Sequence, residues 1–254
     1  MSKLTLTLLG PPRVLHNGRL LKFRSRKELG LLLYLAAEGG SHDREKLAGL
    51  FWPKSGEKAG RAALRNALAG LQKTLKDSAE TPEDTHLIAT RDSICFDFAS
   101  DFDLDLRILE AASSRTDEER REMVAGLRAA VKAYGGDFLE GFHLDDAPDL
   151  GYWLEVERGA WRGRVGEAHD RLSRLQMESG ETPAAIETAA GWVARDPFDE
   201  AASRRLMEAR LASGDRDGAM RDYERYRLLL EKKLGAEPGP EMSALAIRAG
   251  TDAS

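Results

Sequence analysis

The chain has 254 residues, enough for one large domain or two ordinary domains with buried cores. Its 42% hydrophobic and 32% charged residues are typical of a globular protein and exclude a largely disordered chain. The single cysteine, Cys95, excludes an intrachain disulfide and a multi-cysteine zinc site. No apolar run approaches the roughly 20 residues that span a bilayer, and the N-terminus lacks the apolar core of a signal peptide. We therefore expect a cytoplasmic protein that makes no membrane contact.

The charge is unevenly distributed along the chain. Residues 1–80 contain 15 Lys/Arg and 7 Asp/Glu, a net charge of +8, whereas the remainder contains 23 Lys/Arg and 36 Asp/Glu, a net charge of −13. A basic segment joined to an acidic one suits a nucleic-acid regulator, because phosphates attract the first and repel the second. Chance segregation of surface charge explains the same numbers equally well.

The first 25 residues are predicted to form a small antiparallel sheet. Leu4, Leu6 and Leu8 alternate with threonines, which is the period of a strand with one buried face. Asn17-Gly18 is a hairpin signal, because both residues tolerate a positive φ angle.

Three helices are predicted next. Ser25 is a candidate N-cap for a helix through Ala37, with Glu28 in the position of a capping box. A second, short helix is expected to start after Ser41, and a third to run from about residue 57 to residue 76.

Two short strands, at 87–90 and 94–96, then flank the turn Arg91-Asp92-Ser93. A sheet, three helices and a β-hairpin follow one another in the order of a winged helix-turn-helix with an added N-terminal sheet. We therefore predict an α+β DNA-binding domain of this type over residues 1–100.

Residues 101–254 are predicted to be all-helical. No strand is expected after Asp101, and Asp101 or Asp103 can cap a helix that begins near Leu104. Further helices are expected at about 117–134, 148–178, 183–194, 199–212 and 216–234. Glu178-Ser179-Gly180-Glu181 recurs 34 residues later as Ala212-Ser213-Gly214-Asp215, which is the period of tetratricopeptide (TPR) helix pairs. The second domain is accordingly predicted to be a TPR-like helical repeat, with an ordinary helical bundle as the alternative.

The third predicted helix has two different faces. Spacing at 100° per residue places Leu64, Ala67, Leu68, Leu71 and Leu75 on one apolar stripe. The adjoining face carries the candidate base readers Arg61, Arg65, Asn66, Gln72 and Lys73. Arg, Asn and Gln are the side chains that pair with guanine or adenine edges in the major groove. A solvated basic face is the alternative, and the position between a short helix and a hairpin argues against it.

Other basic residues lie where phosphate contacts are expected. Lys54 and Lys58 flank the start of the third helix, and Arg91 lies at the tip of the hairpin. Arg24, Arg26 and Lys27 start the first helix, where phosphate contact and simple solvation are equally supported.

The aromatic residue Trp52 has two competing interpretations. Trp52 could contact RNA polymerase together with Lys54, but an aromatic residue there is more often part of the core.

The sequence contains no glycine-rich phosphate loop and no His-x-x-x-His pair. We therefore expect no enzymatic activity, metal or cofactor.

Several blocks together resemble a known family. They are Leu47-Ala48-Gly49-Leu50-Phe51-Trp52-Pro53 with Arg61 to Leu68, Tyr134 to Phe142, Trp153 to Arg158, and Leu234 to Glu241. On these blocks the chain resembles SARP-type transcriptional regulators, which join an OmpR-like winged helix to a bacterial transcriptional activation domain (BTAD). The resemblance covers nearly the whole length.

The resemblance implies a transcriptional activator that binds double-stranded DNA in a sequence-specific way. In the family the third helix enters the major groove and the hairpin the minor groove, and side-by-side protomers on direct repeats recruit RNA polymerase holoenzyme. The helical domain would serve dimerisation, regulation or polymerase recruitment. The short turn Arg91-Asp92-Ser93 departs from the glycine-rich tip of relatives, and Asp92 would repel phosphate.

Two alternatives stay open at this point. The helical part could be the main functional element, a TPR-like scaffold that binds a protein partner. The chain could also be the regulatory fragment of a larger multidomain regulator, because the family includes longer proteins. The operator, any effector, and the choice between activator and repressor do not follow from the sequence.

Overall fold

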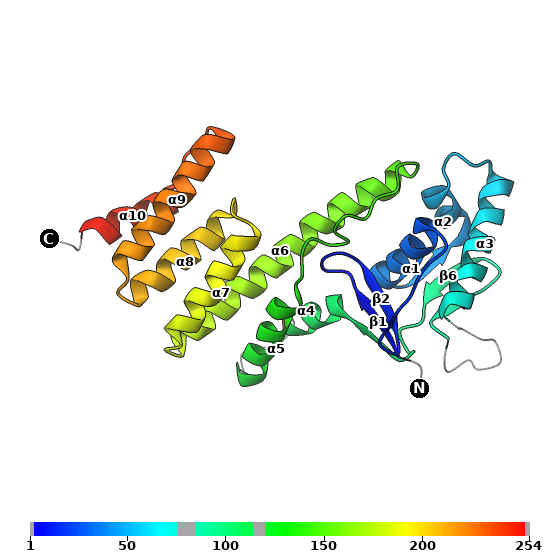
Figure 1. Ribbon diagram of the computed structural model, residues 1–254, viewed down its shortest axis with the longest axis horizontal. Helices are drawn as coiled ribbons and strands as arrows, with labels where there is room; N and C mark the ends of the chain where they lie inside the picture. Colours follow the sequence, from blue (N-terminus) through cyan, green and yellow to red (C-terminus); the bar gives the residue numbers. More distant parts are fainter. Residues whose placement is uncertain (1–2, 76–84, 114–119, 252–254) are drawn as a thin grey trace. The chain divides into compact units, whose positions relative to one another are not determined.

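The computed structural model describes residues 3–75, 85–113 and 120–251 (Figure 1). The chain forms two compact units. Unit 1 comprises Met1–Arg107 and Ala133–Arg162, and unit 2 comprises Ile108–Lys132 and Gly163–Ser254. The domain boundary predicted between residues 100 and 101 stays a prediction. Within the described ranges, no helix has the length and apolar character needed to cross a membrane.

A four-stranded sheet opens unit 1. Its strands are β1 (Leu4–Thr7), β2 (Arg13–His16), β3 (Arg19–Leu20) and β7 (Phe102–Leu104), in the order β3-β2-β1-β7. Leu4 and Leu6 are buried, as their alternation with threonine predicts. Asn17 and Gly18 have φ angles of 49° and 75°, so the predicted hairpin turn between β2 and β3 is confirmed.

Strand β7 corrects the prediction that no strand follows Asp101. It pairs with β1 in parallel, with Leu4 opposite Phe102. The next helix, α4 (Asp105–Ser113), begins after β7, so neither Asp101 nor Asp103 is its cap. Asp103 instead pairs with Lys3 at 2.9 Å.

Asp105 fastens α4 to the end of β1. Its Oδ2 atom accepts hydrogen bonds from the backbone N–H groups of Leu8 and Leu9, both at 2.8 Å. Burial raises the pKa of the Asp105 carboxyl group, although these N–H donors oppose the shift.

Three helices and a second sheet complete the N-terminal part of unit 1. They are α1 (Arg26–Glu38), β4 (Ser41–Asp43), α2 (Arg44–Phe51), α3 (Glu57–Leu75), β5 (Leu87–Ala89) and β6 (Ser93–Phe96), with the sheet order β4-β6-β5. The Ser25 side chain accepts the Glu28 N–H, so the predicted cap of α1 is confirmed. Ser41 does not precede α2 directly: it begins β4, and Asp43 is the N-cap. Residue 76, the predicted end of the third helix, lies outside the described residues.

The segment after helix α5 (Arg120–Ala133) packs back on the N-terminal part of unit 1. The N–H groups of Gly135 and Leu139 donate to the carbonyl oxygens of Leu9 and Leu8, at 3.1 and 2.7 Å. The long helix α6 (Pro148–Glu178) begins in unit 1 and ends in unit 2. Its Arg158 donates hydrogen bonds to the carbonyl oxygens of Phe138, Leu139 and Phe142. The family block Tyr134 to Phe142 is therefore a loop held by backbone hydrogen bonds to Leu8 and Leu9 and by arginine side chains of α6.

Unit 2 is made of helices. Besides the second half of α6 it contains α5 (Arg120–Ala133), α7 (Thr182–Arg195), α8 (Glu200–Ala212), α9 (Arg216–Leu234) and α10 (Pro240–Thr251). α8 packs against both α7 and α9. The helices predicted near these positions are present, although residues 117–119 of the predicted 117–134 helix lie outside the described residues. α10 was not predicted; Met242 and Leu245 pack its apolar face against Tyr226 of α9 and Met207 of α8.

The 34-residue repeat has the same local geometry in both copies. Gly180 and Gly214 both adopt a left-handed conformation, with φ angles of 76° and 80°, after the first helix of a pair. Ala185 and Ala219 are both fully buried in the second helix. The sequence repeat is therefore a structural repeat of helix, glycine turn and helix.

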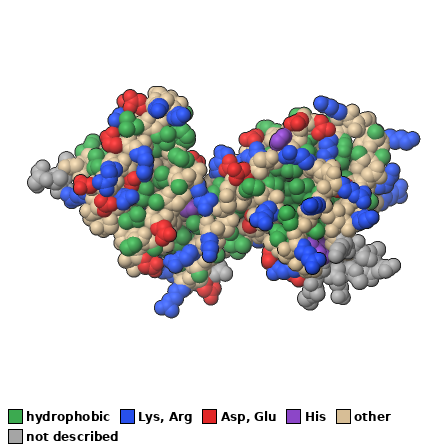
Figure 2. Space-filling model, viewed as in Figure 1, with side chains coloured by type: hydrophobic (Ala, Val, Ile, Leu, Met, Phe, Trp, Pro, Cys, Tyr) green, Lys and Arg blue, Asp and Glu red, His purple; other side chains and the backbone are tan. Residues whose placement is uncertain are grey.

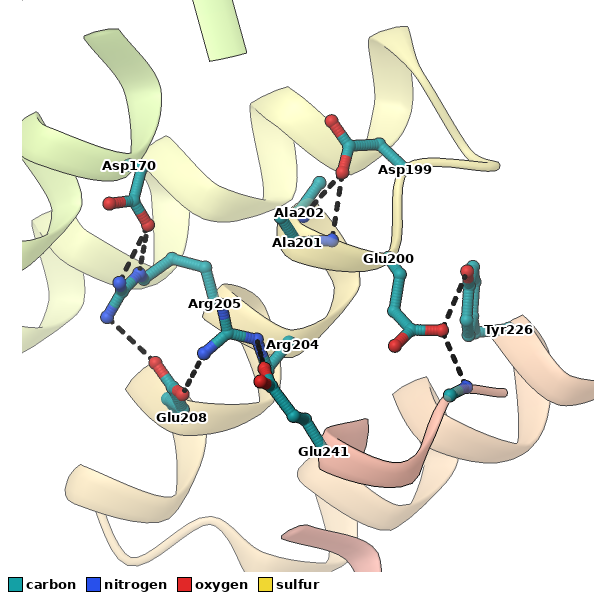
Figure 3. A network of polar contacts seen from close by, with 11 residues as sticks. Asp170, Asp199, Glu200, Ala201, Ala202, Arg204, Arg205, Glu208, Tyr226 and Glu241 are labelled. Atoms are coloured by element: carbon teal, nitrogen blue, oxygen red, sulfur yellow. Dashed lines mark hydrogen bonds and ion pairs between the residues drawn. The ribbon is translucent and has the colours of Figure 1, made fainter. Parts of the chain in front are cut away.

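Glu200 of α8 contacts the C-terminal family block, Leu234 to Glu241. The Glu200 carboxylate accepts the N–H of Gly239 at 2.7 Å and lies 3.5 Å from the hydroxyl of Tyr226 (Figure 3). Burial and this carboxylate raise the pKa of Tyr226 to about 12. Nearby, Arg205 joins Asp170 of α6 to Glu208 of α8 (Figure 3). The Glu200 contact fixes the segment between α9 and α10 against α8, and the Arg205 contacts join α8 to α6.

Candidate nucleic-acid interface

The exposed face of α3 carries most of the predicted base readers. Arg61, Arg65, Asn66 and Lys73 are exposed, and Gln72 is half-buried. The opposite stripe is buried, with Leu64 and Leu71 at 1% and 0% exposure. Figure 2 shows Lys and Arg side chains gathered at the end of unit 1 where α3 lies in Figure 1. The structure therefore presents the predicted polar face to solvent, while contact with DNA stays a prediction.

Arg61 differs from its neighbours on this face because it is paired with two carboxylates. Its Nη2 atom lies 2.7 Å from Oε1 of Glu57, one turn earlier on α3, and also contacts Oε1 of Glu45 on α2. Arg65 makes no ion pair with any residue that the structure describes. Arg61 and Arg65, one helical turn apart, therefore differ in that only Arg61 is ion-paired within the part of the chain that the structure describes.

The β5–β6 turn lies beside α3 and is fixed to the start of α2. The N–H of Arg44 donates to the carbonyl oxygen of Asp92, and its Nε donates to that of Thr90, both at 3.0 Å. Thr90 closes the turn through its hydroxyl, which accepts the N–H of Ser93 at 3.0 Å. The exposed Arg91 at the tip is carried by this anchored turn.

One depression brings several predicted residues together. It is lined by Asp43, Arg44, Glu45, Arg61, Leu64, Arg65, Arg91 and Asp92. Arg61, Arg65 and Arg91 therefore share one surface, and three acidic side chains line it with them. Of the acidic residues, Asp92 was expected beside Arg91, whereas Asp43 and Glu45 were not anticipated from the sequence. Glu45 acquires its place from the packing of α2 against α3, for which a single sequence contains no signal.

Lys54 and Lys58 are exposed in the α2–α3 loop and the first turn of α3, as expected for phosphate-contacting residues. Trp52 is half-buried at the end of α2. Its ring lies 5.9 Å from that of Phe51 and 5.4 Å from the ammonium group of Lys27. Trp52 therefore belongs partly to the core and retains an accessible portion.

The basic residues at the start of α1 are largely engaged within unit 1. Arg26 donates to the carbonyl oxygen of Gly141 at 3.0 Å and lies over the ring of Phe142. Lys27 pairs with Asp146 at 2.6 Å, and this ammonium group lowers the pKa of the Asp146 carboxyl group. Arg24 is exposed. Of these three predicted phosphate contacts, two serve to hold the segment that precedes α6.

The family model of the bacterial transcriptional activator domain matches residues 102–248, more than half of the chain. The chain therefore belongs to this family of SARP-type transcriptional regulators. The resemblance recognised from the sequence blocks is confirmed.

Two curated relatives match nearly all of the chain. The regulatory protein AfsR of Streptomyces griseus is 27% identical over 248 residues, which cover 96% of this chain and 24% of that protein. The transcriptional regulatory protein MoaR1 of Mycobacterium bovis (strain BCG / Pasteur 1173P2) is 24% identical over 259 residues, covering 94% of this chain and 76% of that protein. The chain thus spans about a quarter of the length of AfsR and three quarters of that of MoaR1.

A solved structure, Mycobacterium tuberculosis EmbR in complex with a low-affinity phosphopeptide, has the same fold. It matches with a TM-score of 0.73 at 21% identity, covering 99% of this chain and 66% of that one. At this identity the likeness concerns the fold alone: a small N-terminal α/β part followed by a mostly helical C-terminal part.

Proposed function

We propose that this protein is a sequence-specific, DNA-binding transcriptional activator whose α3 helix enters the major groove. The observation that carries the proposal is the exposed polar face of α3, on which Arg65 and Asn66 are exposed opposite a buried leucine stripe. Arginine and asparagine are the side chains that discriminate guanine and adenine in that groove.

The surrounding elements suit this assignment. α1 to α3 with the β5–β6 hairpin are interpreted as a winged helix-turn-helix within residues 1–100. Lys54, Lys58 and Arg24 would contact phosphates, and Arg91 would reach the minor groove or its phosphates. Arg26 and Lys27 would have to leave their contacts with Gly141 and Asp146 to do the same, so we assign them to the structure of unit 1.

The helical part, residues 101–254, is proposed to be a TPR-like activation domain that serves dimerisation or recruits RNA polymerase holoenzyme. Its 34-residue structural repeat favours this interpretation. Trp52 and Lys54, next to α2, are the proposed polymerase contacts. Binding as side-by-side protomers on direct repeats is the arrangement that the family resemblance implies.

The proposal is tested by fluorescence anisotropy with two labelled duplexes: one that the protein selects from a randomised pool, and a scrambled version of it. We expect a steep loss of affinity as salt rises, because several phosphates are neutralised. Arg65→Ala should weaken binding to the selected duplex by about 1–3 kcal/mol and binding to the scrambled duplex much less.

Arg19→Ala is the matched control, because Arg19 is an exposed arginine of the N-terminal sheet, away from α3. It should leave both affinities unchanged. Equal losses on the two duplexes for Arg65→Ala would remove Arg65 as a base reader.

A second candidate function rests on the helical repeat. TPR-like helix pairs form grooves that bind protein segments, so unit 2 could act mainly as a protein-binding scaffold, within this chain or as part of a longer regulator. Absence of any retained duplex at low salt would favour the scaffold over the DNA-binding proposal.

A further inference from the structure

Among the described residues of the α3 face, Arg61 is a basic side chain that carboxylates from two helices hold. Glu57 reaches it from the preceding turn of α3, and Glu45 reaches it from the first turn of α2. Both carboxylates contact the same nitrogen, Nη2. The Nε and Nη1 atoms have no hydrogen-bond partner among the residues that the structure describes, and about half of the side chain, 49%, is exposed. Both carboxylates therefore engage Nη2, while the N–H groups of Nε and Nη1 stay available for a further acceptor.

The first turn of α2, which carries Glu45, is itself firmly held. The Asp43 side chain accepts the N–H groups of Glu45 and Lys46, at 2.7 and 3.1 Å, and these donors lower the pKa of the Asp43 carboxyl group. The N–H of Arg44 is bound to Asp92 of the β5–β6 turn. Glu45 thus projects from a backbone that three hydrogen bonds secure.

This arrangement has two consequences for an arginine that faces DNA. A free arginine attracts phosphates whatever the sequence, whereas paired carboxylates offset that attraction and add repulsion of their own. Fixing the long side chain before binding also reduces the conformational entropy lost when it meets a base. The pairing therefore weakens general attraction and favours a contact that leaves both ion pairs in place.

We propose that Glu45 and Glu57 are specificity-determining residues that position Arg61 to donate from Nε or Nη1 to an acceptor on a base edge, such as O6 or N7 of guanine. Specificity is the difference between two affinities, and these carboxylates increase it mainly by lowering affinity for unselected DNA. The inference rests on the proposed function, since it assigns roles within the same DNA-binding face.

The test compares the unmodified 254-residue chain with its Glu45→Gln variant, using the selected and scrambled duplexes described above. We compare the dissociation constant for the scrambled duplex divided by that for the selected duplex. This ratio should fall about five- to tenfold in Glu45→Gln, because binding to the scrambled duplex tightens while binding to the selected duplex does not. In an Arg61→Ala background, the same substitution should leave the ratio unchanged, since its effect acts through Arg61.

Asp92→Asn is the matched control for charge. Asp92 lines the same depression as Glu45 but, in the part of the chain that the structure describes, forms no ion pair or hydrogen bond with Arg61. Removing its charge should therefore tighten binding to both duplexes by the same factor. Circular dichroism verifies that each variant is folded. If Glu45→Gln behaves like Asp92→Asn, or still lowers the ratio when Arg61 is absent, the positioning role is overturned. If the unmodified protein selects no sequence from the pool, the proposed function fails, and this inference fails with it.

Discussion

The carboxylate of Asp137 accepts two hydrogen bonds from the guanidinium group of Arg162, from Nε at 2.8 Å and from Nη2 at 2.7 Å. The two parallel contacts join the loop after α5 to the long helix α6, within unit 1. The guanidinium group also lowers the pKa of the Asp137 carboxyl group. This pairing is one of the contacts by which α6 holds the family block Tyr134 to Phe142.

Replacing Arg162 should affect the pKa of Asp137 more than the stability of unit 1. In Arg162→Gln we expect the pKa of Asp137 to rise, as measured by NMR titration of the carboxyl carbon. The free energy of unfolding at pH 7 should fall by about 1 kcal/mol or less, because both partners are partly exposed.

Since the folded-state pKa of Asp137 is lowered, the stability contributed by the pair is present above the unfolded pKa, about 3.9, and is lost as pH falls through the folded value. Arg19→Gln, which removes an exposed arginine elsewhere in unit 1, should leave the Asp137 titration unchanged. An unshifted Asp137 titration in Arg162→Gln would contradict the assignment.

Two glycines of unit 1 should respond oppositely to alanine. A Cβ atom on Gly30 of α1 would lie 2.7 Å from Phe142 Cζ and 3.3 Å from Phe51 Cε1, so Gly30→Ala overpacks an aromatic contact. Overpacking costs about 1–3 kcal/mol, against a gain of about 1 kcal/mol in helix propensity. We expect a lower midpoint of thermal unfolding.

Gly49 of α2 is the control, because a Cβ atom there meets nothing within 4 Å. Gly49→Ala should raise the midpoint through helix propensity alone. Stabilisation by Gly30→Ala would mean that Phe142 yields easily and does not set the position of its loop.

His169 of α6 should make unit 2 sensitive to mild acid. The ring is 1% exposed, its Nδ1 atom lies 2.9 Å from the Val165 carbonyl oxygen, and it is stacked 6.0 Å from Trp192. Burial lowers the pKa of His169. The unfolded chain therefore binds a proton near pH 6.5 that the folded chain does not, and stability falls below that pH by up to about 1.4 kcal/mol per pH unit.

Urea unfolding at pH 7.5 and pH 5.5 measures this effect. The loss on acidification should be smaller in His169→Phe than in the unmodified protein. If the free energy of unfolding falls equally on acidification with and without the His169 ring, His169 is excluded as the cause.

Lys58, in the first turn of α3, is expected to contact phosphate rather than bases. Lys58→Ala should weaken binding to the selected and scrambled duplexes by about the same factor and reduce the salt slope of log K by about 1. Anisotropy titrations between low and moderate salt provide both quantities. Lys132→Ala, a change on α5 of unit 2, should leave the slope unaltered, and a loss confined to the selected duplex would make Lys58 a base reader.

Local patterns in the sequence were sufficient for much of the fold. The leucine stripe from Leu64 to Leu75 predicted the buried face of α3, and Asn17-Gly18 predicted the first hairpin, because the signals lie within one element. The 34-residue recurrence predicted matched turns at Gly180 and Gly214 for the same reason.

The features that were missed depend on partners distant in the sequence. Strand β7 has three residues and exists because Leu4 lies opposite Phe102. Strand β4 likewise needs β6, with Ser41 opposite Cys95. In the candidate interface, the Glu45–Arg61 contact depends on how α2 meets α3 and could not be predicted. The Glu57–Arg61 pair has the i,i+4 spacing of a single helix, so this pair was missed although the sequence contains its signal.

Unit 1 is discontinuous in the sequence, since residues 108–132 lie between its two pieces. A fragment that stops at residue 107 would retain the sheets and α1 to α3 but lose Phe142, which covers Gly30, and Trp153, whose indole donates to Glu38 and packs on Tyr34. Apolar surface on α1 would then be open to water. A truncation meant to isolate the candidate interface should therefore extend through Arg162, and aggregation of a shorter piece would not argue against DNA binding by the whole chain.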